Sequence, residues 1–130
     1  AHPKSDYSSG SFGNRQIIKY HTKDLIMYAD KVIMQLCNTM SWVTLADKPF
    51  AFVATDDYIA LSHQKRHFNM LAALFGKEIY NIEHCDFSEV AFSKVSQEIR
   101  TKYIYTYLTD KEIERKRNID ILKDYYESMS

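Results

Sequence analysis

Three histidines have types and spacing that could do chemistry. His63 and His67 are four residues apart, so on a helix they share one face, which is the geometry that two imidazoles need to bind one metal ion. A third ligand could come from the strand or loop predicted next, which carries Glu83, His84, Cys85 and Asp86, and His84 is the residue assigned to that role. Gln64 stands where the zinc metalloprotease motif has its general-base glutamate, so that mechanism has no support. The alternative interpretation is that His63 and His67 are polar residues on the exposed side of a helix.

A cluster of basic residues is the second candidate. No acidic residue occurs between Asp57 and Glu78, and this stretch contains His63, Lys65, Arg66, His67 and Lys77. Most of these residues lie near the start of a predicted helix, where unpaired backbone N–H groups also attract anions. The cluster predicts binding of a phosphate, an acidic protein or a nucleic-acid backbone. An ordinary solvated helix face is the alternative.

Tyrosines form the third candidate. Tyr103, Tyr105 and Tyr107 alternate with other residues, so a strand would carry them on one face, next to Arg100 and Lys102. They predict either packing at the edge of the core or a protein interface, with base stacking as a further alternative. Nothing in the chain matches the RNA-recognition consensus. Tyr126, on the last predicted helix, joins the predicted interface.

The sequence lacks the motifs of several kinds of catalysis and ligand binding. The chain has 3 glycines and no glycine-rich phosphate-binding loop, nucleophile elbow or calcium loop. The adjacent carboxylates Asp56 and Asp57 fall in a predicted turn, where Asp usually bonds its own backbone. We therefore expect no cofactor, and the sequence favours a protein that is not an enzyme.

Cys37 and Cys85 are far apart and follow no metal-binding or redox spacing. We expect two buried or half-buried free thiols. A disulfide between them, or a reactive thiol, is the alternative. The sequence contains no visible signal peptide, although a removed one would leave no trace. The cellular compartment therefore stays open, with a slight preference for the inside of the cell.

The first half of the chain predicts a long helix and a hairpin. Apolar residues recur at helical spacing from Leu25 to Met40, after a capping Thr22 and an acidic Asp24. Residues 50–54 and 58–61 are short aromatic and β-branched runs, and the polar residues 55–57 between them favour a β-hairpin. A helix capped by Thr55 is the alternative to the second arm.

The second half predicts further helices and strands. Ser62 and Gly76 bracket a helix whose buried stripe is Phe68, Leu71, Ala72 and Phe75. Beyond it we expect a strand over 78–85, a helix over 88–102 and a strand over 103–108. A capping box, Thr109 with Glu112, opens a last helix that runs to about Ser128.

These elements indicate one α+β domain over residues 16–130. We expect three to four helices packed on a small, mainly antiparallel sheet, with a nearly all-α fold as the alternative. Residues 1–15 hold two of the three glycines and four serines, which is typical of a flexible tail or linker.

Composition narrows the class of function. The 17 basic and 17 acidic residues balance, which argues against a globally basic nucleic-acid binder, and no apolar run is long enough to span a membrane. The leading hypothesis is a protein-interaction or regulatory domain that binds a protein partner or itself through tyrosine-rich and amphipathic helical surfaces. A nucleic-acid-binding accessory protein that uses the basic 63–77 segment comes second. A small metal-dependent enzyme comes third.

Overall fold

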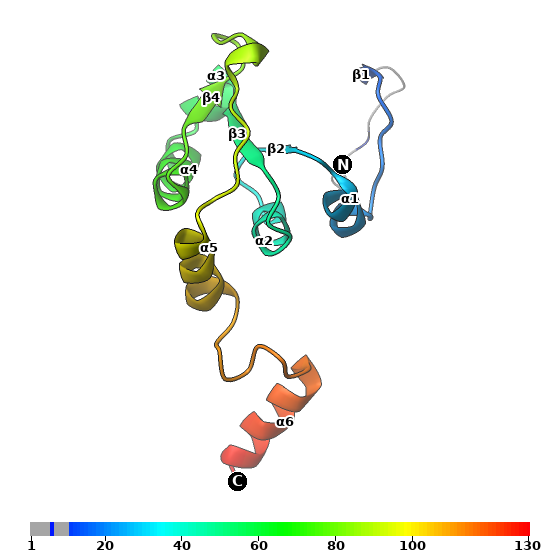
Figure 1. Cartoon of the computed structure of the whole chain (residues 1–130), viewed down its shortest axis with the longest axis vertical. Coiled ribbons are helices and arrows are strands. Elements are labelled where there is room, and N and C mark those ends of the chain that lie inside the picture. Colours follow the sequence, from blue (N-terminus) through cyan, green and yellow to red (C-terminus); the bar gives the residue numbers. More distant parts are fainter. Residues whose placement is uncertain (1–5, 7–10) are drawn as a thin grey trace. The chain divides into compact units, whose positions relative to one another are not determined.

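The computed structural model describes Asp6 and residues 11–130, and it contains six α-helices and one small sheet in that part of the chain (Figure 1). The chain divides into two units, residues 1–95 and residues 96–130. In the first unit the elements are β1 (Ser11–Asn14), α1 (Thr22–Tyr28), β2 (Val32–Met34), α2 (Thr39–Leu45), β3 (Phe50–Ala54), α3 (Asp56–Ala60), α4 (Ser62–Phe75), β4 (Ile79–Asn81) and the 3-10 helix η1 (Phe87–Glu89). The second unit contains α5 (Gln97–Tyr103), the π-helix η2 (Ile104–Leu108) and α6 (Asn118–Ser128).

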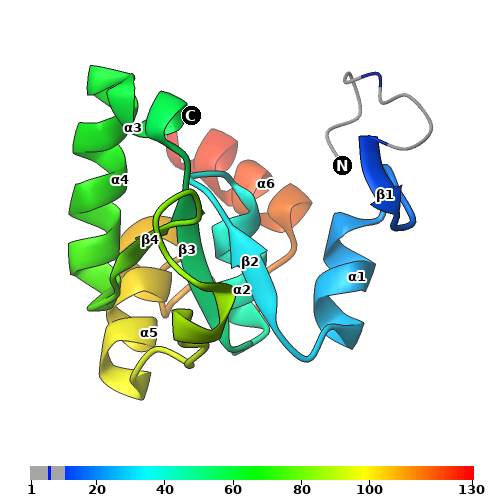
Figure 2. The same cartoon turned by 90° about the horizontal axis from the view of Figure 1, so that it is seen from above.

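The sheet has the strand order β2-β3-β4, and both strand pairs are parallel (Figure 2). The predicted mainly antiparallel sheet is therefore wrong. Each crossover contains a helix, because parallel neighbours cannot be joined by a tight turn. One antiparallel bridge, between Phe50 and Ser93, attaches the segment that returns after β4.

The central strand β3 carries the core of the first unit. All five of its residues are buried, as expected for a parallel strand that is covered on both faces. The ring of Phe52 makes edge-to-face contacts at 5.2 Å with Phe50 and with Phe68 of α4. Phe75 contacts both strand residues, so α4 is attached to the sheet through aromatic pairs.

The long helix predicted after Thr22 is divided in the structure. The chain leaves α1 at Ala29, which is extended (φ −71°, ψ 139°), and forms β2 before it enters α2. Residues with helical spacing therefore belong to three elements. Val32 and Ile33 are β-branched, which favours a strand. This strand pairs with Phe50 and Ala51, and the long-range pairing determines the structure here instead of the local helical pattern.

The predicted hairpin is also wrong in its second arm. β3 forms as expected, but Thr55 caps α3, and its hydroxyl oxygen accepts a hydrogen bond from the Tyr58 N–H at 3.3 Å. The alternative helix capped by Thr55 is thus the correct one. Thr55 is extended and provides an N-cap, which favours a helix start over a turn.

Two predictions about the second unit fail. Residues 103–108 form the end of α5 and η2 instead of a strand, and Tyr103 stacks on Tyr107 at 5.4 Å, as neighbours four apart on a helix do. The last helix begins at Asn118 instead of Thr109. The predicted capping box is absent there, because the Thr109 N–H donates to the Ile104 carbonyl oxygen.

The helix bracketed by Ser62 and Gly76 is confirmed as α4. Gly76 follows its last residue in the left-handed conformation (φ 64°), which costs glycine little. Phe68, Ala72 and Phe75 are buried, and Leu71 is half-buried.

Most of the predicted tail lies outside the described residues. Of its described residues, which are Asp6 and residues 11–15, Ser11–Asn14 form β1. Within the described chain, none of the helices combines the length and the apolar character that crossing a bilayer requires.

Candidate functional site

A cluster of polar side chains lies at the carboxyl ends of two neighbouring strands. β3 and β4 are parallel, and Ala54 is the register partner of Asn81, so the residues that follow both strands emerge at one edge of the sheet. Asp56 comes from the start of α3, and Glu83 and His84 come from the turn after β4. In open α/β sheets, this edge is where ligands commonly bind.

Asp56 is the centre of this carboxyl-end cluster. Its Oδ1 accepts a hydrogen bond from the Asn81 amide at 2.8 Å, and its Oδ2 lies 2.7 Å from Nε2 of His84. The backbone N–H of Asp56 donates to Glu83 Oε2 at 2.5 Å. Asn81 in turn accepts from the Glu83 N–H at 3.0 Å, so the turn after β4 is tied to the start of α3.

These contacts define what the cluster can do chemically. Two hydrogen bonds lower the pKa of Asp56, and the one from Asn81 has a larger effect than the one from His84. The carboxylate of Asp56 therefore stays ionised. The ionised carboxylate holds the imidazole of His84 through Nε2. Both side chains are exposed, so the carboxylate and the imidazole are in contact with solvent.

The predicted metal ligands are not brought together. In residues 6 and 11–130, no three His, Cys, Asp or Glu side chains form a group that could hold a metal ion. His84 faces Asp56, while His63 and His67 are exposed on the first turns of α4. The proposed set of His63, His67 and His84 therefore gains no support from the geometry.

The basic cluster is split by the fold. His63, Lys65, Arg66 and His67 are exposed near the start of α4, whose first turn contains no acidic residue. Lys77 follows the other end of this 14-residue helix, roughly 20 Å away at the usual rise per residue. Binding of an anion or a nucleic acid at the start of α4 stays a prediction, and it now depends on His63, Lys65, Arg66 and His67 alone.

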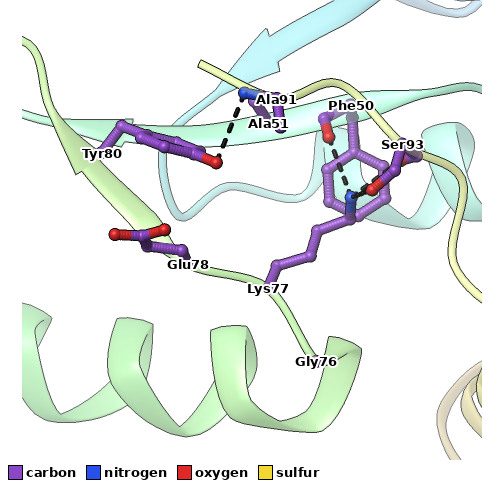
Figure 3. A pocket seen from close by; sticks show the side chains of 8 residues that line it. All are labelled: Phe50, Ala51, Gly76, Lys77, Glu78, Tyr80, Ala91 and Ser93. Carbon is purple, nitrogen blue, oxygen red and sulfur yellow. Dashed lines mark hydrogen bonds between the residues drawn. The ribbon is translucent and has the colours of Figure 1, made fainter. Parts of the chain in front are cut away.

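Lys77 ties three chain segments together instead. Its ammonium donates to the Phe50 carbonyl oxygen at 2.9 Å, to the Ser93 carbonyl oxygen at 2.7 Å and to Ser93 Oγ at 2.9 Å (Figure 3). It also lies 4.2 Å from the centre of the Phe50 ring. All three ammonium protons are therefore used, and burial lowers the pKa of Lys77.

A cavity of about 240 Å³ lies beside this lysine. Figure 3 shows Lys77 reaching across it toward Phe50 and Ser93, and the hydroxyl of Tyr80 bonded to the Ala91 N–H. Because the ammonium has three protein acceptors, Lys77 positions the returning segment and has no proton left to hold an anion.

The predicted tyrosine interface is not one surface. Tyr103 is buried, and the hydroxyl of Tyr105 donates to Glu114 Oε2 at 2.5 Å, which raises the pKa of Tyr105. Tyr107 and Tyr126 are exposed, at 64% and 67%. The hypothesis of a protein interface therefore rests on Tyr107 and Tyr126.

The carboxyl-end cluster was largely missed by the sequence interpretation. His84 was considered as a metal ligand, and Asp56 as a turn residue. Glu83 was named only as a possible metal ligand, and Asn81 carried no signal, because only the parallel pairing of β3 and β4 places them beside Asp56. Cys37 and Cys85 are free thiols, as expected, although Cys37 is exposed.

No known protein family matches the chain, and neither the curated proteins nor the solved structures contain a match to it. The fold and the side chains themselves are therefore what indicate a function.

Proposed function

We propose that this protein is an interaction domain that binds a protein partner through helix α6. The observation that carries the proposal is the stripe of exposed apolar side chains on this helix. Ile119, Leu122 and Tyr126 of α6, and Met129 at its C-cap, are each at least half exposed. They follow one another at spacings of three, four and three residues, so they lie on one side of the helix.

The energetics of the second unit support this function. Among residues 96–130, Tyr103 is the one buried residue, and α6 contains none. An isolated helix of 11 residues is shorter than the roughly 12–15 residues at which helices become marginally stable in water. Such a helix gains its stability from packing its apolar side, and a partner protein would supply that packing.

The ion pairs of this unit do not replace an apolar partner. Arg117 bonds both carboxylate oxygens of Asp120, and Lys116 lies 2.7 Å from Asp124. These pairs are exposed, and exposed pairs contribute little to stability. They leave the apolar stripe available, because Asp124 lies on the opposite side of the helix from it.

Site-directed photo-crosslinking in the protein's native source tests this function. A photoreactive residue at Leu122 is expected to form a defined covalent adduct with a protein partner, or with a second copy of the chain. The same residue at Asp124 is the matched control and should form none, because it faces away from the stripe.

Hydrogen exchange on the purified chain provides the second readout. The amides of residues 118–128 should exchange quickly in the dilute chain and slowly in the complex. Protection of these amides in a dilute monomer, or equal adducts from both crosslinker positions, would overturn the proposal.

A further inference from the structure

A second cavity of about 240 Å³ lies among α3, α4 and β4. A buried cavity of about 150 Å³ is enough to hold benzene, so this space accommodates one aromatic ring with a small substituent. Its lining is mostly apolar, with two polar side chains, and consists of Tyr58, Ile59, Lys65, Phe68, Asn69 and Ile79.

The aromatic side of the cavity is held in place by the fold. The ring of Tyr58 makes an edge-to-face contact with Phe68 at 5.8 Å, and Phe68 packs on Phe52 in the core. The hydroxyl of Tyr58 is hydrogen-bonded to the backbone of Leu36, beyond the end of β2. A ring that is anchored at both ends loses little freedom when a ligand packs on it, which favours binding.

The polar side of the cavity carries a positive charge. Lys65, Phe68 and Asn69 are spaced three and four residues apart on α4, so they share one side of the helix. Lys65 and Asn69 form no side-chain hydrogen bond or ion pair with other described residues. The ammonium and the amide are therefore both available to a ligand at an apolar cavity.

We propose that this cavity binds a small aromatic carboxylate. The ring would pack against Tyr58, Phe68 and the aliphatic residues, and the carboxylate would accept hydrogen bonds from Lys65 and Asn69. A single ammonium matches the charge of a monoanion. The apolar lining selects a ring over a free inorganic anion, because an ion without apolar surface gains nothing from leaving water there.

Amide chemical shifts of the full-length, ¹⁵N-labelled chain test this binding. Benzoate is the probe, and benzamide is its neutral counterpart of nearly the same shape. A ligand of this size binds at about millimolar Kd, and the exposed ion pair should favour benzoate by about 2–5-fold. The shifted amides should belong to α3, residues 65–69 of α4, and β4.

Three variants separate the cavity from general surface charge. Lys65→Gln should remove the preference for benzoate, and Lys65→Arg should retain it. Arg66→Gln is the matched control, because Arg66 is an exposed neighbouring cation that does not line the cavity. Because positions 65 and 66 are exposed, all three variants should keep the amide spectrum of the folded chain.

Several results would overturn the proposal. One is equal binding of benzoate and benzamide, and another is an equal loss of preference in Lys65→Gln and Arg66→Gln. Shifts confined to residues 62–64 would indicate anion binding at the helix start instead. The absence of any shift at tens of millimolar ligand would exclude the site.

Discussion

The two units of this chain are stabilised in different ways. In the first, Phe50, Phe52, Phe68 and Phe75 form a network of ring contacts around a strand that is buried along its whole length. In the second, Tyr103 is the single buried residue among residues 96–130. Burial of apolar area is the dominant favourable term in folding, so the first unit contains its own source of stability.

The polar contacts differ in the same way. Lys77 in the first unit is half-buried and donates to three acceptors, two of them backbone carbonyl oxygens. In the second unit Lys116 and Arg117 form exposed ion pairs with acidic residues. The difference indicates that the first unit contains its own core, while the second unit has little buried surface of its own.

The largest expected effect comes from the core of the first unit. Phe52→Ala removes a fully buried ring that contacts three other rings, so we expect a loss of about 3–5 kcal/mol in unfolding free energy. Tyr126→Ala, in the exposed stripe of α6, should change it by less than about 0.5 kcal/mol. Denaturant unfolding of the full chain measures both, and similar losses would contradict the contrast between the units.

A smaller effect is expected from the hydrogen bonds that Lys77 donates to Phe50 and Ser93. Lys77→Met keeps the aliphatic chain but leaves the acceptors of Phe50 and Ser93 without the ammonium, which should cost about 1–3 kcal/mol. Lys94→Met is the matched control, because Lys94 makes one exposed contact at 3.5 Å with Asp47. Denaturant unfolding again provides the measurement. An equal loss of unfolding free energy in both variants would show that the hydrogen bonds of Lys77 stabilise the fold no more than the exposed contact of Lys94 does.

The smallest expected effect is the acid sensitivity of the carboxyl-end cluster. The folded state lowers the pKa of Asp56, so the contribution of its carboxylate to stability is present above the ordinary value of 3.8 and is lost as the pH falls through the lower folded pKa. Asp56→Asn should therefore flatten the acid limb of a plot of unfolding free energy against pH. Asp57→Asn, the exposed neighbour, should leave that limb unchanged, and the reverse result would remove Asp56 from the centre of the cluster.

The contrast between the units also explains which predictions succeeded. α4 was predicted with its correct end and with a start one residue late, since Leu61 and not Ser62 is the N-cap, because its signals are local: a buried stripe at helical spacing and a glycine just beyond the last turn. β3 was predicted from a short apolar run. The prediction of a long helix over residues 22–40 was wrong. Val32 and Ile33 fit the local helical spacing, but in the fold they form a strand that pairs with Phe50 and Ala51.

The candidate sites divide in the same way. Lys77 was predicted as an anion ligand from its charge, and the fold places it among protein acceptors. The four basic residues near the start of α4 kept their predicted exposure, because a polar helix face is encoded by the helix alone. The pairing of Asp56 with His84 joins residues 28 positions apart, which no local pattern specifies.

Taken by itself, the sequence determined α4, the apolar run of β3, the absence of glycine-rich phosphate loops and the alternative that Thr55 caps a helix. Each of these depends on residues within a few positions of one another. The tertiary structure decided that the sheet is parallel, that Asp56, Asn81 and His84 meet at one edge, and that Lys65 borders an aromatic cavity. Those outcomes depend on which strands pair across long separations, and the free energy of that pairing comes from the packing of the whole unit.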